Sequence, residues 1–341
     1  MKFFRRFTVI ILFTLIVLVI ITYIIILPAA STKQNKLISK NDSVILINEW
    51  QAPDTNSIAS TEEGNLIRYG KNLISNTSYY FGPKGTVAHI TNGMNCQNCH
   101  LDAGLKPYGN CFSAVASTYP TFRPRSGIVE SIEFRINDCL QRSLNGKSID
   151  GSSKEMRAMV AYLKWIGNGV PKGSKPKGAG TEELAYLNRA ADPINGKIIY
   201  EIKCQSCHGK NGEGLLNTDS TGYVYPPLWG NHSYNTGAGL YRLTKFAGYV
   251  KNSMPFGASH QNPQLTNVEA WDVAAFINSQ SRPKKSVPKD WPSLSLKAID
   301  YPFGPYTDSF SETQHKFGPY GPIKKAKDEM NKQNKATASS K

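Results

Sequence analysis

Two stretches decide the fold of this 341-residue chain: Cys96-Gln97-Asn98-Cys99-His100 and Cys204-Gln205-Ser206-Cys207-His208. In each, two thiols three residues apart can form thioether bonds to one haem, and the following histidine is then held under the ring as an iron ligand. The sequence therefore predicts two covalently bound haem c groups. A zinc site would need the two cysteine pairs to act together, and a histidine directly after each pair does not favour it.

The surroundings of the two motifs form an internal repeat. A helix is predicted ahead of each motif, over residues 64–74 and 192–204, and an amphipathic helix closes each segment, over 153–166 and 266–277. An insertion of about twenty residues separates the first of these helices from Cys96. Helix, haem motif, irregular middle and closing helix is the order of class I cytochrome c domains. The predicted fold is therefore mostly α, with two such domains in tandem.

Changes in composition predict the domain boundaries. The Gly-, Pro- and Lys-rich stretch from Val170 to Thr181 is typical of a linker. The predicted parts are an anchor or signal peptide (1–30), a polar spacer (31–60), the first, catalytic domain (61–175), a linker (176–190), the second, electron-transfer domain (191–285) and an extended C-terminal tail (286–341). We expect roughly the last 18 residues of that tail to be disordered, because they are rich in lysine and polar residues.

The N-terminus predicts export. Lys2, Arg5 and Arg6 precede an uncharged apolar run from Thr8 to Leu27, which as a helix would span ~30 Å, about the thickness of a bilayer core. This length favours an uncleaved anchor, although residues 28–31 (PAAS) keep cleavage open. The basic flank stays inside, so we expect the remainder on the periplasmic side of the cytoplasmic membrane, held there by the N-terminal helix.

The charge balance favours anionic partners. Forty Lys and Arg against 25 Asp and Glu give a net charge of +15, which attracts anions and acidic protein surfaces. The basic residues form no recognisable nucleic-acid motif, and many lie in the final segment, so nucleic-acid binding is not expected.

The second iron ligand differs between the two segments. In the second, Met254 stands in a loop 12 residues before Thr266, and a His/Met iron has a raised potential that suits electron transfer. In the first, Cys139 occupies the equivalent place, and a thiolate ligand would lower the potential. A Cys111–Cys139 disulfide, an inert buried thiol and His89 as ligand are alternatives. Met156 and Met159 have the spacing of core residues.

Three further stretches carry a family resemblance. They are residues 96–104 (CQNCHLDAG), 119–127 (YPTFRPRSG) and 135–146 (RINDCLQRSLNG), joined in the tail by 301–306 (YPFGPY) and 314–320 (QHKFGPY). From about residue 61 to 323 the chain resembles the dihaem thiosulfate dehydrogenases, which are also tetrathionate reductases, and more distantly the catalytic haem domain of the thiosulfate-binding cytochromes. The resemblance implies an enzyme that couples two thiosulfates into tetrathionate, or runs that reaction in reverse.

The resemblance also implies roles for individual residues. Cys139 would be the distal ligand of the first haem at the active site, and Arg125, Arg135 and Ser143 would bind the substrate anion. Guanidinium groups suit this task because they bind oxyanions through paired, charge-assisted hydrogen bonds. Weaker candidates are Arg123, Arg142 and Lys106. The chain departs from some members in having Ser253 in place of a lysine directly before Met254, and the family offers no role for Cys111.

Two other functions compete with this one. A plain dihaem electron carrier would need two saturated irons, whereas a cysteine among arginines implies a substrate pocket. A dihaem peroxidase would need an open or displaceable ligand. In the enzyme, electrons would leave through the second haem to an external carrier, such as a soluble cytochrome c or a membrane complex.

Overall fold

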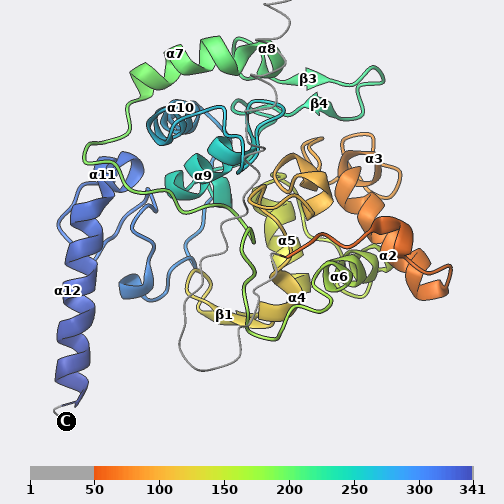
Figure 1. Cartoon of the computed structure of the whole chain (residues 1–341), viewed down its shortest axis with the longest axis horizontal. Helices are drawn as coiled ribbons and strands as arrows, with labels where there is room; N and C mark the ends of the chain where they lie inside the picture. The colour runs from red at the N-terminus through yellow and green to blue at the C-terminus, as the bar shows by residue number, and fades with distance from the viewer. Residues whose placement is uncertain (1–49, 340–341) are drawn as a thin grey trace, which may run out of the picture. The chain divides into compact units, whose positions relative to one another are not determined.

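The computed structural model describes residues 50–339, which are mostly helical with two short hairpins (Figure 1). The helices of the first half are α2 (Glu62–Ser75), α3 (Thr77–Phe81), α4 (Val115–Thr118), α5 (Ile132–Arg142) and α6 (Lys154–Ile166). Those of the second half are α7 (Pro193–Lys203), α8 (Gln205–His208), α9 (Leu243–Ser253), α10 (Asn267–Ser279), α11 (Glu312–Phe317) and α12 (Tyr320–Ser339). The hairpins pair β1 (Thr121–Arg123) with β2 (Ile128–Glu130), and β3 (Leu215–Leu216) with β4 (Tyr223–Tyr225).

The four predicted helices are confirmed, and their first turns show why they begin where they do. The side chains of Thr61, Ser153 and Asp192 each accept a hydrogen bond from a backbone N–H of the helix that follows. Thr266 and Glu269 form the predicted capping box of α10, in which each side chain accepts from the other residue's backbone.

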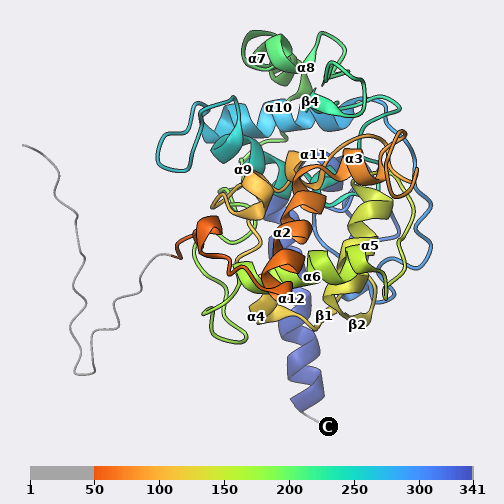
Figure 2. The same cartoon turned by 90° about the vertical axis from the view of Figure 1, so that its right-hand side faces the viewer.

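The internal repeat is visible in how these helices pack. α2 crosses α6 in the first half (Figure 2), and α7 crosses α10 in the second. Each crossing is made at a glycine: a Cβ at Gly70 would lie 2.0 Å from the Ala158 carbonyl oxygen, and one at Gly196 would lie 2.0 Å from that of Asp272. Only glycine lets the two backbones approach so closely. The insertion in the first half lies between the end of α2 and Cys96 and contains α3.

Each half buries its own apolar core. Met156 and Met159 are 0% and 1% exposed in the first core, as expected from their helical spacing. Trp271 of α10 is 1% exposed in the second core. Two separate cores, each closed by its own helix pair, support the expectation of two tandem haem domains.

The predicted linker has no helix or strand, yet it packs against the first half. Cys111 exchanges backbone hydrogen bonds with Gly180 at 3.2 and 3.0 Å, and the Ser117 hydroxyl donates to the Ser174 carbonyl at 2.7 Å. The division into domains of residues 61–175 and 191–285 stays a prediction.

The expectation of a disordered end is wrong for residues 324–339. The C-terminal helix α12, drawn in blue in Figure 1, runs through them to Ser339. Its first turns are held by Tyr320 and Ile323, which are 2% and 0% exposed in the second core. Lys324 and Asp328 form an ion pair one turn apart. Composition alone did not show that two apolar residues anchor this polar helix.

The predicted membrane anchor, from Thr8 to Leu27, lies outside the described residues. Within residues 50–339, no helix has the length and apolar character needed to cross a bilayer.

Asp300 fastens the C-terminal segment to the start of α9, and its removal should destabilise the protein. Its carboxylate is fully buried and accepts from Arg242 Nε at 2.8 Å and from the Thr244 hydroxyl at 2.5 Å. Burial alone would raise the pKa of Asp300, but Arg242 and Thr244 outweigh it and lower the pKa. We expect Asp300→Ala to lower the free energy of unfolding by about 3 kcal/mol at neutral pH.

The pH dependence of this effect has a defined sign. Because the folded-state pKa lies below the unfolded value of about 4, the stabilisation is present above pH ~4 and is lost as the pH falls through the folded pKa. Thermal unfolding of wild type and variant should therefore differ most at pH 7 and converge in acid. A difference in thermal stability between wild type and Asp300→Ala that grows as the pH falls would contradict the stabilising role of the ionised carboxylate.

Candidate functional site

The first haem-attachment motif is folded so that its histidine can bind iron. Its backbone makes a single 3₁₀ turn, η2 (Cys96–Asn98), and the backbone N–H of Cys96 donates to the Thr77 hydroxyl at 3.0 Å. His100 Nδ1 lies 2.7 Å from the Asn110 carbonyl oxygen. Burial lowers the pKa of His100 to about 4, so the ring is neutral at pH 7 and Nδ1 donates to that carbonyl. Nε2, which Asn110 Nδ2 approaches to 3.4 Å, is therefore the atom that would bind a metal.

The second motif repeats this arrangement. His208 Nδ1 lies 2.9 Å from the Pro226 carbonyl oxygen, and burial again lowers the pKa of the ring. All six cysteines of the chain are free thiols, so both pairs are available for thioether bonds. The thiols, the oriented imidazoles and their carbonyl acceptors together fit covalently attached haem in both halves.

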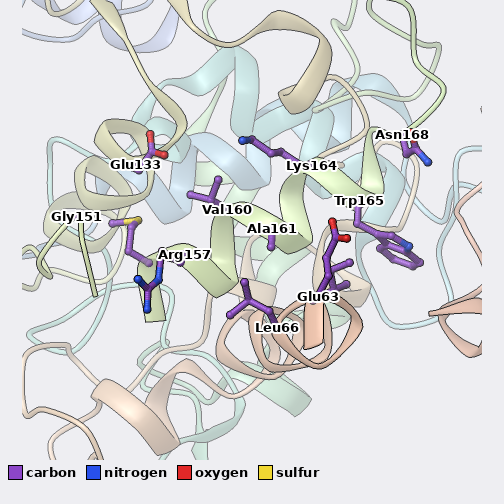
Figure 3. A pocket seen from close by; sticks show the side chains of 12 residues that line it. Glu63, Leu66, Glu133, Gly151, Arg157, Val160, Ala161, Lys164, Trp165 and Asn168 are labelled. Carbon is purple, nitrogen blue, oxygen red and sulfur yellow. The ribbon is translucent and has the colours of Figure 1, made fainter. Parts of the chain in front are cut away.

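A cavity of about 590 Å³ lies beside the first motif. His100 and Cys99 line it, together with Cys139, Ser143 and a group of arginines. A second cavity, of about 610 Å³, lies along α2 and α6 (Figure 3). Neither cysteine nor histidine lines that second cavity, whereas both line the first, so the first is the candidate site.

Helix α5 places the main polar groups of the site. Arg135, Asp138, Cys139 and Arg142 recur at intervals of three and four residues, so they share one face of this helix, and Ser143 is its C-cap. Coulombic attraction to the Cys139 thiolate, and to the Asp138 carboxylate, raises the pKa of the Arg135 guanidinium. The predicted residues Cys139, Arg135 and Ser143 are thus brought together at the cavity.

The β1–β2 hairpin contributes the third predicted anion-binding residue. Arg125 lies in the turn between the two strands and reaches Asp138 on α5. Arg123 also lines the cavity, but its side chain is 40% exposed and lies 4.0 Å from Glu130. Lys106, another weak candidate, does not line the cavity and donates to the Ala258 carbonyl at 2.8 Å.

Asp138 joins three arginines. Its Oδ2 accepts from Arg125 Nη2 and, at 2.7 Å, from Arg135 Nη1, while its Oδ1 accepts from Arg142 Nε at 2.5 Å. Burial alone would raise the pKa of this carboxyl, but the three guanidinium groups outweigh it and lower the pKa. Asp138 is therefore ionised at neutral pH, and it holds the arginines in fixed positions.

The C-terminal segment completes the wall of the cavity, which the sequence did not predict. Asp290 accepts from both terminal nitrogens of Arg142, at 2.9 and 2.7 Å. The backbone N–H of Trp291 donates to the Arg125 carbonyl at 2.6 Å, and Trp291 and Tyr301 line the cavity. Tyr301 begins one of the tail stretches that carry the resemblance, but Asp290 belongs to no motif.

The alternatives to Cys139 are placed elsewhere. Cys111 is buried, lies 3.9 Å from the Leu105 carbonyl oxygen and does not line the cavity, and no Cys111–Cys139 disulfide is formed. His89 is exposed and also does not line the cavity.

In the second half, Met254 is the C-cap of α9 and packs, like Cys204 and Trp229, against the second core. Lys251 points to Glu182 at 3.7 Å, and Ser253 is 3% exposed. The same helix reaches the first motif, because the Tyr249 hydroxyl donates to the Asn98 carbonyl at 2.8 Å. Cys99 itself packs against the second core.

Comparisons with known proteins agree with this organisation. Residues 86–171 match the family model of the SoxA/TsdA cytochrome c domain, and residues 194–281 match that of cytochrome c. A thiosulfate dehydrogenase of Psychrobacter arcticus is 38% identical over 244 residues, covering 71% of each chain. One of Allochromatium vinosum is 36% identical over 224 residues, covering 64% of this chain and 79% of that one.

A solved structure is also similar. The thiosulfate dehydrogenase TsdBA of Marichromatium purpuratum, in its as-isolated form, superposes with a TM-score of 0.64 and 31% identity. The match covers 70% of this chain and 50% of that protein, so this chain spans half its length. Identity of this degree over most of the sequence means that this chain belongs to the thiosulfate dehydrogenase family, and its two cytochrome c domains carry two covalently bound haem c groups.

Proposed function

We propose that this protein is a dihaem oxidoreductase that interconverts thiosulfate and tetrathionate at its first haem. The observation that carries the proposal is that Cys139 lines the same cavity as His100, beside Arg125 and Arg135. A plain electron carrier has no use for a thiol among arginines in a cavity. The named relatives support the choice of substrate.

The charges around the cavity suit two dianions. Like charges a few ångströms apart repel strongly at low dielectric, so two thiosulfates can meet only where cations offset that repulsion. Arg125 and Arg135 each direct one terminal nitrogen at Asp138 and keep other N–H groups for a ligand. The Ser143 hydroxyl, at the end of α5, is a further donor at the cavity. We assign these three residues to substrate binding.

Cys139 is the proposed distal ligand of the first haem and the nucleophile. The Cys139 thiolate bonds to the sulfane sulfur of thiosulfate, giving Cys–S–S–SO₃⁻, and the two electrons released would be taken up by the haem groups that the two attachment motifs hold. A second thiosulfate then attacks the cysteine-bound sulfane sulfur, which forms tetrathionate and returns the Cys139 thiolate. The arginines hold the sulfonate groups during both steps.

Haem held by Cys96, Cys99 and His100, and by Cys204, Cys207 and His208, would supply the one-electron acceptors for this reaction. The contact between the halves supports transfer from the first haem to the second, because α9 touches the first motif at Asn98 and ends at Met254. Met254 is the proposed second ligand of that iron. From there electrons pass to an external carrier, such as a soluble cytochrome c or a membrane complex.

We further propose that the protein works on the periplasmic side of the cytoplasmic membrane, anchored by its N-terminal helix. The basic residues before the apolar run of Thr8 to Leu27 support this orientation. Haem attachment through thioethers in an exported chain agrees with it.

A pair of assays tests the proposed function. The purified holoprotein should oxidise thiosulfate with ferricyanide as acceptor and reduce tetrathionate with a reduced dye as donor. Loss of both activities on adding excess of a redox-inert dianion, such as sulfate, is expected because it competes for the arginines. A fully haem-loaded protein without either activity would refute the assignment.

A further inference from the structure

We propose that Asp138 is a positioning residue for substrate binding, and that Asp290 of the C-terminal segment supports it from the far side of Arg142. The inference rests on the proposed function and explains how the substrate arginines are held. The five groups form one chain of charge-assisted hydrogen bonds, from Arg125 and Arg135 through Asp138 and Arg142 to Asp290.

All three nitrogens of Arg142 donate hydrogen bonds, and Nη1 also reaches the Gly237 carbonyl oxygen at 3.3 Å. Its Nε donates to Asp138, and its two terminal nitrogens donate to Asp290 in the paired geometry that suits a guanidinium group. The side chains of Arg142 and Asp290 are only 12% and 8% exposed. Each nitrogen of Arg142 thus already donates to the protein, so we assign this arginine to holding Asp138 rather than to binding the substrate.

The bonds between Arg142 and Asp290 determine which arginine donates to which carboxylate oxygen of Asp138. Because Asp290 occupies both terminal nitrogens of Arg142, Arg142 takes only Oδ1 of Asp138. Oδ2 is then shared by Arg125 and Arg135, which come from the hairpin and from α5. A single carboxylate oxygen thus sets the separation of the two arginines that are assigned to the substrate.

This arrangement predicts that replacing Asp138 weakens the binding of a dianion, whereas net charge alone would predict tighter binding. Removing a carboxylate from the site adds one net positive charge, which by itself would tighten the binding of a dianion. If Asp138 positions the arginines, its loss weakens binding in spite of that gain. Asp138→Glu separates the effect of net charge from that of positioning, because it keeps the negative charge and changes the geometry of the carboxylate.

The experiment compares Asp138→Asn, Asp138→Glu and Asp290→Asn in the holoprotein. We expect Asp138→Asn to raise the KM for thiosulfate by about tenfold or more, which corresponds to one lost charge-assisted hydrogen-bond set. Asp138→Glu should raise it as well, and Asp290→Asn should raise it severalfold, with kcat less affected in all three. Asp290→Asn keeps the test decisive if the Asp138 variants do not accumulate.

The matched control is Asp272→Asn. Asp272 is also buried and accepts from both terminal nitrogens of an arginine, Arg189, at 2.9 and 2.8 Å, but it does not line the cavity. The Asp272→Asn variant should have a lower melting temperature than the wild type and an unchanged KM for thiosulfate. An Asp138→Asn enzyme with an unchanged or lower KM would overturn the proposal.

Binding of sulfate, measured by calorimetry, separates this inference from the proposed function. Sulfate is a redox-inert dianion, and the part of its binding that Arg125→Gln removes reports the arginine site. This part should weaken in Asp138→Asn and Asp290→Asn even if thiosulfate proves not to be a substrate. Equal or tighter sulfate binding at that site in both variants would refute the positioning role, whatever the wild-type activity.

Discussion

Replacing Cys139 by glycine abolishes thiosulfate oxidation and tetrathionate reduction while both haems stay attached. The attachment cysteines and both proximal histidines are untouched, so haem content per chain should remain two. Turnover should fall by at least about 10³-fold, since loss of a covalent nucleophile leaves only binding and electrostatics to act. Visible spectra of the oxidised protein should lose the signature of thiolate-ligated iron at the same time.

Cys111→Ala is the matched control for this variant. Cys111 is a free thiol like Cys139, but it is buried away from the cavity. Its replacement should leave both activities and the thiolate spectrum in place. Wild-type turnover in Cys139→Gly would show that this cysteine takes no part in the mechanism. Loss of the thiolate spectrum in Cys111→Ala would show that Cys111, and not Cys139, binds the iron.

Replacing Met254 by alanine should block the exit of electrons. The second iron would lose its thioether ligand, so the absorption band of methionine-ligated iron should disappear and the potential of that centre should fall. Reduction of the first haem by thiosulfate in a single turnover should persist, whereas steady-state transfer to an external cytochrome should drop steeply. Stopped-flow and steady-state rates measured on the same sample distinguish these two steps.

Met159→Leu provides the control here, because Met159 is a methionine of the first core, 1% exposed. A leucine of similar volume should leave the band, the potential and the rates unchanged. Persistence of the methionine band in Met254→Ala would show that another residue ligates the second iron.

Local patterns were sufficient to predict the framework of this protein. Each of the four predicted helices begins at a side chain that caps it, such as Ser153 or Thr266, and each haem motif is contiguous in sequence. Cys139 was predicted from its place in the internal repeat, whereas Arg135 and Ser143 were identified through the family resemblance; one helix brings all three to one place. Arg125 was identified through its resemblance to the family, since it comes from a separate hairpin.

Contacts between distant segments could not be predicted in this way. Asp290 meets Arg142 across 148 residues, and no pattern around Asp290 marks it as part of a site. The end of the chain was misjudged for a related reason: α12 is polar along most of its length, and Tyr320 and Ile323, in its first turns, are the described residues that enter the second core. The average composition of this segment does not reveal two apolar residues that are buried in the core.

The reach of the C-terminal segment limits how this enzyme can be divided. A fragment that ends at the linker would contain Cys139 and the arginines of α5 and the hairpin. It would lack Trp291 and Tyr301 from the wall of the cavity, and Asp290, which holds Arg142. The catalytic half is therefore not a transplantable module. In chimaeras between family members, the first haem domain and the segment after the second have to be exchanged together, because residues of both form the wall of the cavity.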